Sequence, residues 1–346
     1  MCGIIGYIGS KEAAPILLRG LRRLEYRGYD SAGLALLQNG EIKRVRSVGK
    51  IDSLVEKLKG QNVDGNIGIA HTRWATHGGV TEDNAHPHVS MEGKLVLAHN
   101  GIIENYRELK ERLPGVKFMS DTDSEVLAHL IGSFYKGNLR QAVAKALSLV
   151  HGTYGIVVMH ADHPDILVAA RMGSPLVIGM GDGDYYIASD ATPLLAYTNK
   201  VVFLNDGEIA EISRESAQTF NLKDEQVMKC VEEIDWDDKT AEKQGYAHFM
   251  LKEIFDQPRV FKDAIRGRFK LEDGTAHLGG LNMSEADMRS VNRIILIACG
   301  TASYAGMAGK YAFERLAGIP TTVEIASEFR YSDPIIDEHT LVFGIS

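Results

Sequence analysis

The chain begins MCGIIG (residues 1–6), which places a thiol at the head of an apolar strand. Because an initiator methionine is usually trimmed when the next side chain is small, we expect Cys2 to carry the free α-amine. An α-amine has a pKa of roughly 7.7–8.0 and can act as a base near neutral pH. Cys2 would then hold both a nucleophile and the base that activates it. Its position alone is equally compatible with a small buried hydrophobic residue.

Short apolar runs separated by turn signals follow Cys2 over the first two-thirds of the chain. Asn39-Gly40, between the runs 34–37 and 42–48, predicts a hairpin. Similar strand pairs are predicted at 154–160 with 166–171, 176–180 with 185–189, and 201–204 with 208–212. Apolar residues recur at helical spacing in 13–26, 51–59, 105–112, 123–135 and 139–150. Hairpins and helices in separate blocks predict two sheet layers covered by helices.

The pattern changes after residue 234. A polar segment, 235–248, predicts a linker, and the helices 249–255 and 259–266 are expected to follow it. The remaining elements alternate as in a parallel α/β unit: strand 294–299, turn 300–302, helix 303–316, strand 321–325 and strand 341–345. Parallel sheets bind ligands beyond the carboxyl ends of their strands. Because the chain stops at Ser346, directly after a strand, we expect this second domain to be incomplete.

Composition limits the classes of protein to consider. A chain of 346 residues, 45% of them hydrophobic, can form two domains. Its net charge of −8 gives no general attraction to nucleic acid or to an anionic membrane. We find no apolar run long enough to span a bilayer and no signal peptide, so we expect a cytoplasmic protein. The cysteines are too few and too widely spaced for a disulfide framework: Cys2, Cys230 and Cys299.

Several histidines lie close together in the sequence: His71, His77, His86, His88 and His99. His86-Pro87-His88 has the spacing of a paired metal-ligand motif. Cysteine partners and an HExxH helix are missing, so we expect no metal site.

Five motifs then occur in order: MCGIIG from Met1, EYRGYDSAG from Glu25, HTRWATHG from His71, AHNGIIEN from Ala98 and SDTDSE from Ser120. Together they resemble the class II glutamine amidotransferase domain, an N-terminal-nucleophile hydrolase. The resemblance implies that residues 2–234 form a four-layer αββα sandwich of the α+β class. It also implies that Cys2 releases ammonia from L-glutamine, and that no cofactor is needed.

The resemblance assigns roles that the residues alone do not. A thiolate attacking a carboxamide generates an oxyanion, which needs fixed donors. Asn100-Gly101 alone predicts a tight turn, whereas the resemblance assigns the pair to the oxyanion hole. Arg73 alone indicates a surface arginine and Asp123 alone a helix N-cap. By resemblance they bind the α-carboxylate and the α-ammonium of glutamine.

The resemblance also implies that residues 73–81 form a loop that closes over glutamine. Thr76 and His77 are implied to contact glutamine, and Trp74 to gate an ammonia channel. By itself Trp74 is equally compatible with an ordinary core aromatic. Arg27, which alone indicates the end of a helix, is implied to order the site beside the nucleophile.

A glutaminase needs an acceptor site, because ammonia released into water is protonated. CGTAS from Cys299 and ASEFRY from Ala326 make residues 249–346 resemble the first part of a sugar isomerase (SIS) domain. A glycine turn between a strand and a helix suits a phosphorylated sugar. The resemblance assigns Thr301 to the sugar phosphate and Ser346 to the start of a phosphate loop. It also indicates serine where this chain has Ala302, which leaves no side-chain contact there.

Both domains together resemble the amidotransferases that transfer ammonia from L-glutamine to fructose 6-phosphate and that form homodimers. The nucleotide loop of an asparagine synthetase and the acidic loop of an amidophosphoribosyltransferase are not found in the sequence. For this chain alone we expect glutamine hydrolysis at most. The alternative is a non-catalytic regulator of the same fold that binds sugar phosphate. The intact set of Cys2, Arg73, Asn100 and Asp123 argues against it.

Overall fold

The computed structural model describes residues 2–234, 245–266, 268–270, 274–276, 281 and 283–345. The chain divides into two compact units, Met1–Phe249 and Met250–Ser346, and each is described by itself. Most of the predicted linker, 235–244, lies outside the described residues. The domain boundaries given by the sequence therefore stay a prediction.

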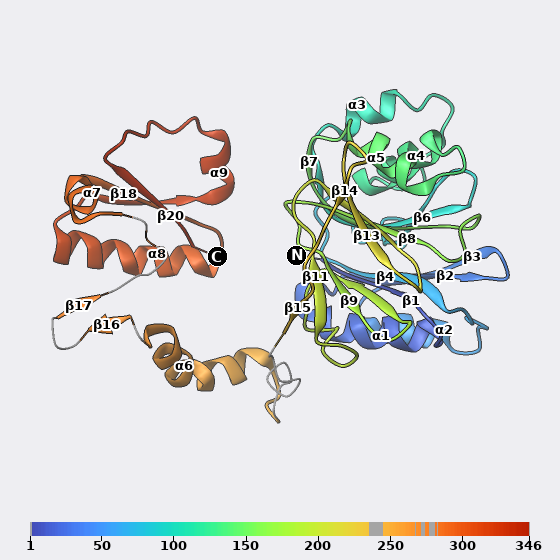
Figure 1. The fold of residues 1–346 in the computed structure, drawn as a ribbon, viewed down its shortest axis with the longest axis horizontal. Helices are drawn as coiled ribbons and strands as arrows, with labels where there is room; N and C mark the ends of the chain where they lie inside the picture. Colours follow the sequence, from blue (N-terminus) through green and yellow to red (C-terminus); the bar gives the residue numbers. More distant parts are fainter. Residues whose placement is uncertain are drawn as a thin grey trace. The chain divides into compact units, whose positions relative to one another are not determined.

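The first unit contains two sheets stacked face to face, and their strand pairs are antiparallel (Figure 1). The eight-stranded sheet runs β15 (Glu232–Glu233), β11 (Lys200–Phe203), β9 (Val177–Met180), β10 (Tyr185–Ala188), β1 (Gly3–Ile8), β4 (Ile67–Arg73), β2 (Ser31–Gln38) and β3 (Glu41–Val48). The seven-stranded sheet runs β14 (Gln226–Val227), β13 (Ala217–Asn221), β12 (Glu208–Ile212), β8 (Leu167–Met172), β7 (Gly152–His160), β6 (Leu95–Ile103) and β5 (His88–Val89).

Helices cover the outer face of each sheet (Figure 1). The eight-stranded sheet carries α1 (Ala13–Leu24) and α2 (Ile51–Leu58), and the seven-stranded sheet carries α4 (Asp123–Phe134) and α5 (Leu139–Leu147). The short helix α3 (Tyr106–Glu111) contacts α4. Three clusters of buried apolar side chains fill the interfaces between these layers. The predicted four-layer αββα sandwich is confirmed.

Local turn signals place most of the hairpins correctly. Asn39-Gly40 joins β2 to β3, and both residues have positive φ, 51° and 80°, as a type I′ turn requires. The predicted pairs β9–β10 and β7–β8 are also present. The predicted pairing of 201–204 with 208–212 is wrong, because β11 pairs with β9 in one sheet and β12 with β8 in the other. Asp206-Gly207 turns the chain from one sheet into the next.

The second unit contains a parallel sheet. β18 (Arg293–Ala298) lies between β19 (Thr321–Ile325) and β20 (Thr340–Ile345) and is parallel to both. Helix α8 (Thr301–Ala312) packs on this sheet and continues into a π-helical turn, Phe313–Ala317. Helix α9 (Ala326–Tyr331) follows β19. The predicted parallel α/β unit is confirmed.

Four further elements precede this sheet in the chain: α6 (Phe249–Ile265), β16 (Phe269–Lys270), β17 (Thr275–Ala276) and α7 (Glu285–Ser290). The prediction of two helices on either side of Pro258 is wrong, because α6 runs through this proline. Proline removes one helical hydrogen bond but does not prevent the helix from continuing. Among the described residues, none of the helices combines the length and the apolar character needed to span a bilayer.

The layer between the two large sheets is polar at one end. The ring of His71, on β4, stacks on His86 at a centroid distance of 4.1 Å, and His86 meets His88 edge-on at 4.6 Å. Burial lowers the pKa of His71 to about 3 and the pKa values of His86 and His88 well below their usual range. These histidines are therefore neutral at physiological pH, and their rings pack as aromatic groups.

A substitution of Ile69 tests the packing between the two sheets, because this side chain is fully buried there. We predict that Ile69→Ala lowers the free energy of unfolding of the first unit by about 2–5 kcal/mol, because it leaves a cavity. Val48→Ala, at a half-exposed position on β3, should change this free energy by no more than about 0.5 kcal/mol. Urea unfolding followed by circular dichroism measures both, and equal effects would contradict the assigned layer.

The buried histidines predict a pH dependence of stability. The unfolded chain binds a proton at His71 below about pH 6.5, whereas the folded unit does so only near pH 3. The stabilisation is therefore complete above pH 6.5 and is lost as the pH falls. Between pH 7.5 and 5.0 we predict that His71→Gln loses about 2 kcal/mol less unfolding free energy than the wild type. His151→Gln, at an exposed position, should match the wild type, and identical behaviour of both variants would be contrary to the prediction.

Candidate active site

Cys2 lies at the start of β1 and beside the end of β4. The two strands are antiparallel, with Gly3 opposite Thr72, so the residue before β1 meets the residues after β4. The backbone N–H of Trp74 donates to Cys2 Sγ at 3.2 Å, and the thiol faces the Trp74 carbonyl oxygen at 3.4 Å. Burial raises the pKa of the Cys2 thiol, and the Trp74 N–H partly offsets that rise. The thiol is therefore protonated near neutral pH and needs a base to become a nucleophile.

A small cavity adjoins the Cys2 side chain. Its walls come from the end of β4, the loop after it, β6 and the start of α4. The lining residues are Cys2, Arg73, Trp74, Thr76, His77, His86, His99, Gly101, Thr122, Asp123 and Ser124. The cavity measures about 20 Å³, which is room for one water molecule. A ligand the size of an amino acid therefore enters only if part of this wall moves.

Asn100, on β6, connects the two sheets at Cys2. Its Nδ2 donates to the Cys2 carbonyl oxygen at 3.2 Å, and its Oδ1 lies 2.9 Å from His71 Nε2. The same His71 nitrogen lies 3.1 Å from the carbonyl oxygen of His99. Because both of its neighbours are acceptors, His71 Nε2 carries the proton and donates. This tautomer fixes the Asn100 amide with its N–H group toward Cys2.

Gly101 lies inside β6, opposite Tyr154. Its φ is 136°, and a Cβ at this position would lie 2.1 Å from the Thr153 carbonyl oxygen. Glycine is therefore required by the backbone conformation and by the neighbouring strand. The prediction of a tight turn from Asn100-Gly101 alone is wrong, because both residues are paired within the strand. The positive φ that a turn would use occurs here without reversing the chain.

Arg27 also holds the backbone of Cys2. It lies in a 3₁₀ turn, η1 (Glu25–Arg27), that follows α1, and its side chain is buried. Its Nε donates to the Cys2 carbonyl oxygen at 3.0 Å, and its guanidinium pairs with Asp190 at 3.4 Å. The Cys2 carbonyl oxygen thus accepts from both Arg27 and Asn100.

Arg73 is the last residue of β4, and its buried side chain lies against the loop that follows. Its guanidinium donates to the carbonyl oxygen of His77 and, at 3.1 Å, to that of Gly79. Trp74, on the same loop, is 48% exposed and packs edge-on against Tyr29 at 5.5 Å. The alternative of an ordinary core aromatic is therefore excluded for Trp74.

Asp123 is the first residue of α4 and is buried in the cavity wall. The residue that caps the helix is Thr122, whose hydroxyl accepts from the Glu125 N–H, so the N-cap interpretation of Asp123 is wrong by one position. Asp123 Oδ2 accepts from the Ile103 N–H at 2.8 Å, and Oδ1 accepts from the Ser124 hydroxyl at 3.2 Å. The carboxylate is therefore fixed between β6 and α4.

The sequence did not identify every residue of this cavity. The sequence offers His99 only as a candidate metal ligand, yet this residue lines the cavity and its Nδ1 lies 2.8 Å from the Ser124 hydroxyl. One available signal was strand periodicity, because His99 and Gly101 are two residues apart and face the same side of β6. Among the described residues, no group of three or more His, Cys, Asp or Glu side chains is placed to hold a metal ion.

The second unit carries the predicted glycine turn at the carboxyl end of β18. Gly300 has a φ of 57°, and Thr301 begins α8 at an exposed position. The Ser303 hydroxyl donates to the Gly300 carbonyl oxygen at 2.6 Å and closes the turn. Ser346, the other residue predicted to bind the sugar phosphate, lies outside the described residues.

Comparison with known proteins agrees with both units. Residues 56–257 match the family model of a glutamine amidotransferase domain, and residues 287–346 match that of a SIS domain. Two curated relatives are named glutamine–fructose-6-phosphate aminotransferase [isomerizing]. The one from Thermus thermophilus is 49% identical over 100% of this chain and 57% of its own length. The one from Chlorobaculum tepidum is 51% identical over 100% of this chain and 58% of its own length.

Solved structures share the fold. An allosteric regulatory enzyme of purine biosynthesis matches with a TM-score of 0.57 and 29% identity, over 64% of this chain and 49% of its own. A glutamine phosphoribosylpyrophosphate amidotransferase from B. subtilis matches with a TM-score of 0.56 and 20% identity, over 97% of this chain and 71% of its own. This chain spans little more than half the length of the two curated relatives. Since the family model covers more than half of the chain, the chain belongs to the glutamine amidotransferase domain family and continues into a SIS domain.

Proposed function

We propose that this chain hydrolyses L-glutamine to glutamate and ammonia, with Cys2 as the nucleophile. The observation that carries the proposal is the arrangement around Cys2: a half-buried thiol beside a small cavity, with the Cys2 carbonyl oxygen held by Asn100 and Arg27. Over the full length of the relatives, the ammonia would pass to fructose 6-phosphate and give glucosamine 6-phosphate. The name of those relatives, glutamine–fructose-6-phosphate aminotransferase, supports this second step.

The reaction begins when the α-amine of Cys2, freed by removal of Met1, takes the thiol proton. The thiolate attacks the carboxamide carbon of glutamine and forms a tetrahedral oxyanion. Asn100 Nδ2 and the Gly101 N–H stabilise this charge as an oxyanion hole. Collapse of the intermediate breaks the C–N bond, the proton moves to the leaving ammonia, and a thioester remains on Cys2. Water then hydrolyses the thioester and releases glutamate.

Arg73 and Asp123 recognise glutamine as a free amino acid. Arg73 receives its α-carboxylate through the guanidinium fork. In the structure the guanidinium N–H groups of Arg73 donate to the carbonyl oxygens of His77 and Gly79. The α-carboxylate of glutamine therefore competes with these carbonyl oxygens for the same donors. Asp123 receives the α-ammonium, because a carboxylate has about four acceptor positions and two donors occupy it here. Thr76 and His77, in the cavity wall, contact the substrate.

The remaining assignments concern the transfer of ammonia. Trp74 gates the ammonia channel, and its exposed position on the loop beside Cys2 supports this role. Thr301 binds the phosphate of fructose 6-phosphate, and its place at the start of α8 suits an anion. The role of Ser346 and a homodimer of the longer enzyme are proposed on the resemblance alone.

Replacing the nucleophile tests the proposal. We predict that Cys2→Ala reduces glutamine hydrolysis at least about 10³-fold, because the covalent route is lost. Cys230→Ala, at an exposed cysteine, should retain the wild-type rate. The measurement is release of labelled glutamate from isotopic glutamine, with glucosamine 6-phosphate assayed in parallel.

Three outcomes would contradict the proposal. Equal rates in the two variants would remove Cys2 from the mechanism. A wild-type chain with no hydrolysis would favour the non-catalytic regulator. Formation of glucosamine 6-phosphate by this chain alone would show that the chain also transfers ammonia to the sugar, contrary to the expectation of hydrolysis at most.

A further inference from the structure

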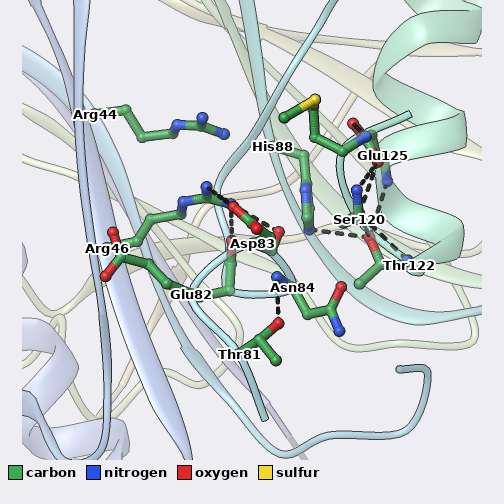
Figure 2. A network of polar contacts seen from close by, with 12 residues as sticks. Arg44, Arg46, Thr81, Glu82, Asp83, Asn84, His88, Ser120, Thr122 and Glu125 are labelled. Carbon is green, nitrogen blue, oxygen red and sulfur yellow. Dashed lines mark hydrogen bonds and ion pairs between the residues drawn. The ribbon is translucent and has the colours of Figure 1, made fainter. Parts of the chain in front are cut away.

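A second pocket opens where the edges of the two large sheets meet. β3 is the edge strand of one sheet and β5 is the edge strand of the other. The pocket between them measures about 320 Å³ and is lined by side chains from both strands and from α4. It shares no lining residue with the cavity beside Cys2. Figure 2 shows Arg44 and Arg46 reaching from β3 toward His88 and the segment that carries Glu125.

The carboxylate of Glu125 is held by hydrogen bonds from other groups of the chain, and its charge acts on Arg44 and Arg46 without an ion-pair contact. It accepts from the Met119 N–H at 2.8 Å, from the Ser120 N–H at 2.7 Å and from the Ser120 hydroxyl at 2.8 Å. Burial alone would raise the pKa of Glu125, but the bonds from His129, Met119 and Ser120 lower it to about 2. The carboxylate therefore stays ionised, and its oxygens are already used as acceptors by groups of the chain.

Arg46 is also committed to the protein. Its Nη1 donates to the carbonyl oxygens of Asp83 at 2.8 Å and Ala85 at 2.9 Å. Its other terminal nitrogen lies 3.5 Å from the Asp83 carboxylate. Arg46 thus anchors the segment that leads into β5. Besides Glu125, the described residues lining the pocket include one carboxylate, that of Asp83, and Arg46 already lies beside it.

Among the described residues, Arg44 has no carboxylate in direct contact. Its Nη1 donates to the Pro87 carbonyl oxygen at 3.2 Å, and no carboxylate of the described residues lies within 4 Å of its guanidinium. Burial and the neighbouring charge of Arg46 lower the pKa of Arg44 to about 10, and the more distant carboxylates of Glu125, Asp83 and Glu82 partly oppose this shift. A guanidinium has five N–H donors, so most of those on Arg44 are available to a ligand. Lys117 adds a third cation to the pocket.

We propose that this pocket binds the oxyanion group of a small metabolite, a phosphate or a carboxylate, between Arg44 and Lys117. A guanidinium without a carboxylate in direct contact can bind an anion through two parallel N–H donors. The apolar side chains of Val89, Met91 and Met119 offer a surface to the carbon skeleton of such a ligand. A volume of 320 Å³ lies within the range of small-molecule sites.

The test measures binding of radiolabelled inorganic phosphate to the full chain by equilibrium dialysis, at an ionic strength fixed with sodium chloride. We expect Arg44→Gln to weaken a saturable phosphate site at least about tenfold, which corresponds to loss of one charged hydrogen-bonded contact. Lys43→Gln is the matched control. It removes the same charge from the preceding residue of β3. The Lys43 ammonium donates to the Asn62 carbonyl oxygen outside the pocket. Lys43→Gln should leave the affinity within about twofold of the wild type.

Two further arms complete the experiment. Lys117→Gln should weaken the same phosphate site, so the result does not depend on a single variant. Succinate added in competition distinguishes the source of the oxyanion: displacement at matched concentration indicates a carboxylate ligand, and no displacement indicates a phosphate ligand. Equal phosphate affinity in the wild type, Arg44→Gln and Lys43→Gln would overturn the proposal. Absence of saturable binding in the wild type would also overturn it. Binding that persists unchanged in Arg44→Gln belongs to another site, such as the turn at Thr301.

Discussion

The amide of Asn100 is the contact on which the site depends. It lies between the two sheets, accepts from His71 on one sheet and donates to the Cys2 carbonyl oxygen at the start of the same sheet. Its orientation is not free, because His71 Nε2 faces two acceptors and must carry the proton. One imidazole tautomer therefore fixes the donor that faces Cys2, and the packing of the two sheets fixes the imidazole.

The surrounding chemistry is consistent with this arrangement. A charged histidine between two sheets would be costly, and burial keeps His71 neutral by lowering its pKa. Burial also raises the pKa of the Cys2 thiol, so the thiol stays protonated near neutral pH until a base acts on it. Entry of a ligand the size of an amino acid requires displacement of a loop whose carbonyl oxygens, those of His77, Gly78 and Gly79, accept from Arg73. The protonation states of His71 and Cys2 and the access of a ligand to the cavity thus depend on contacts within the same small region.

Local chemistry made much of this structure predictable. Asn39-Gly40 fixes a hairpin by its backbone conformation, and apolar spacing identifies the helices that cover the sheets. Sequence could not decide to which sheet β11 and β12 belong, because a turn signal reports where the chain bends and not which strand it joins. Asn100-Gly101 likewise carries a turn signal that pairing with β7 overrides. The role of His71 depends on Asn100, a residue 29 positions away that only the stacked sheets bring near.

Mass spectrometry of the chain after mixing with L-glutamine and rapid quenching in acid tests the central claim most directly. The account predicts an N-terminal peptide that lacks Met1, begins at Cys2 and carries a glutamyl thioester on that cysteine. The claim would be contradicted by continued glutamine hydrolysis with Met1 retained, or by a glutamyl adduct found on Cys230 or Cys299 instead of Cys2.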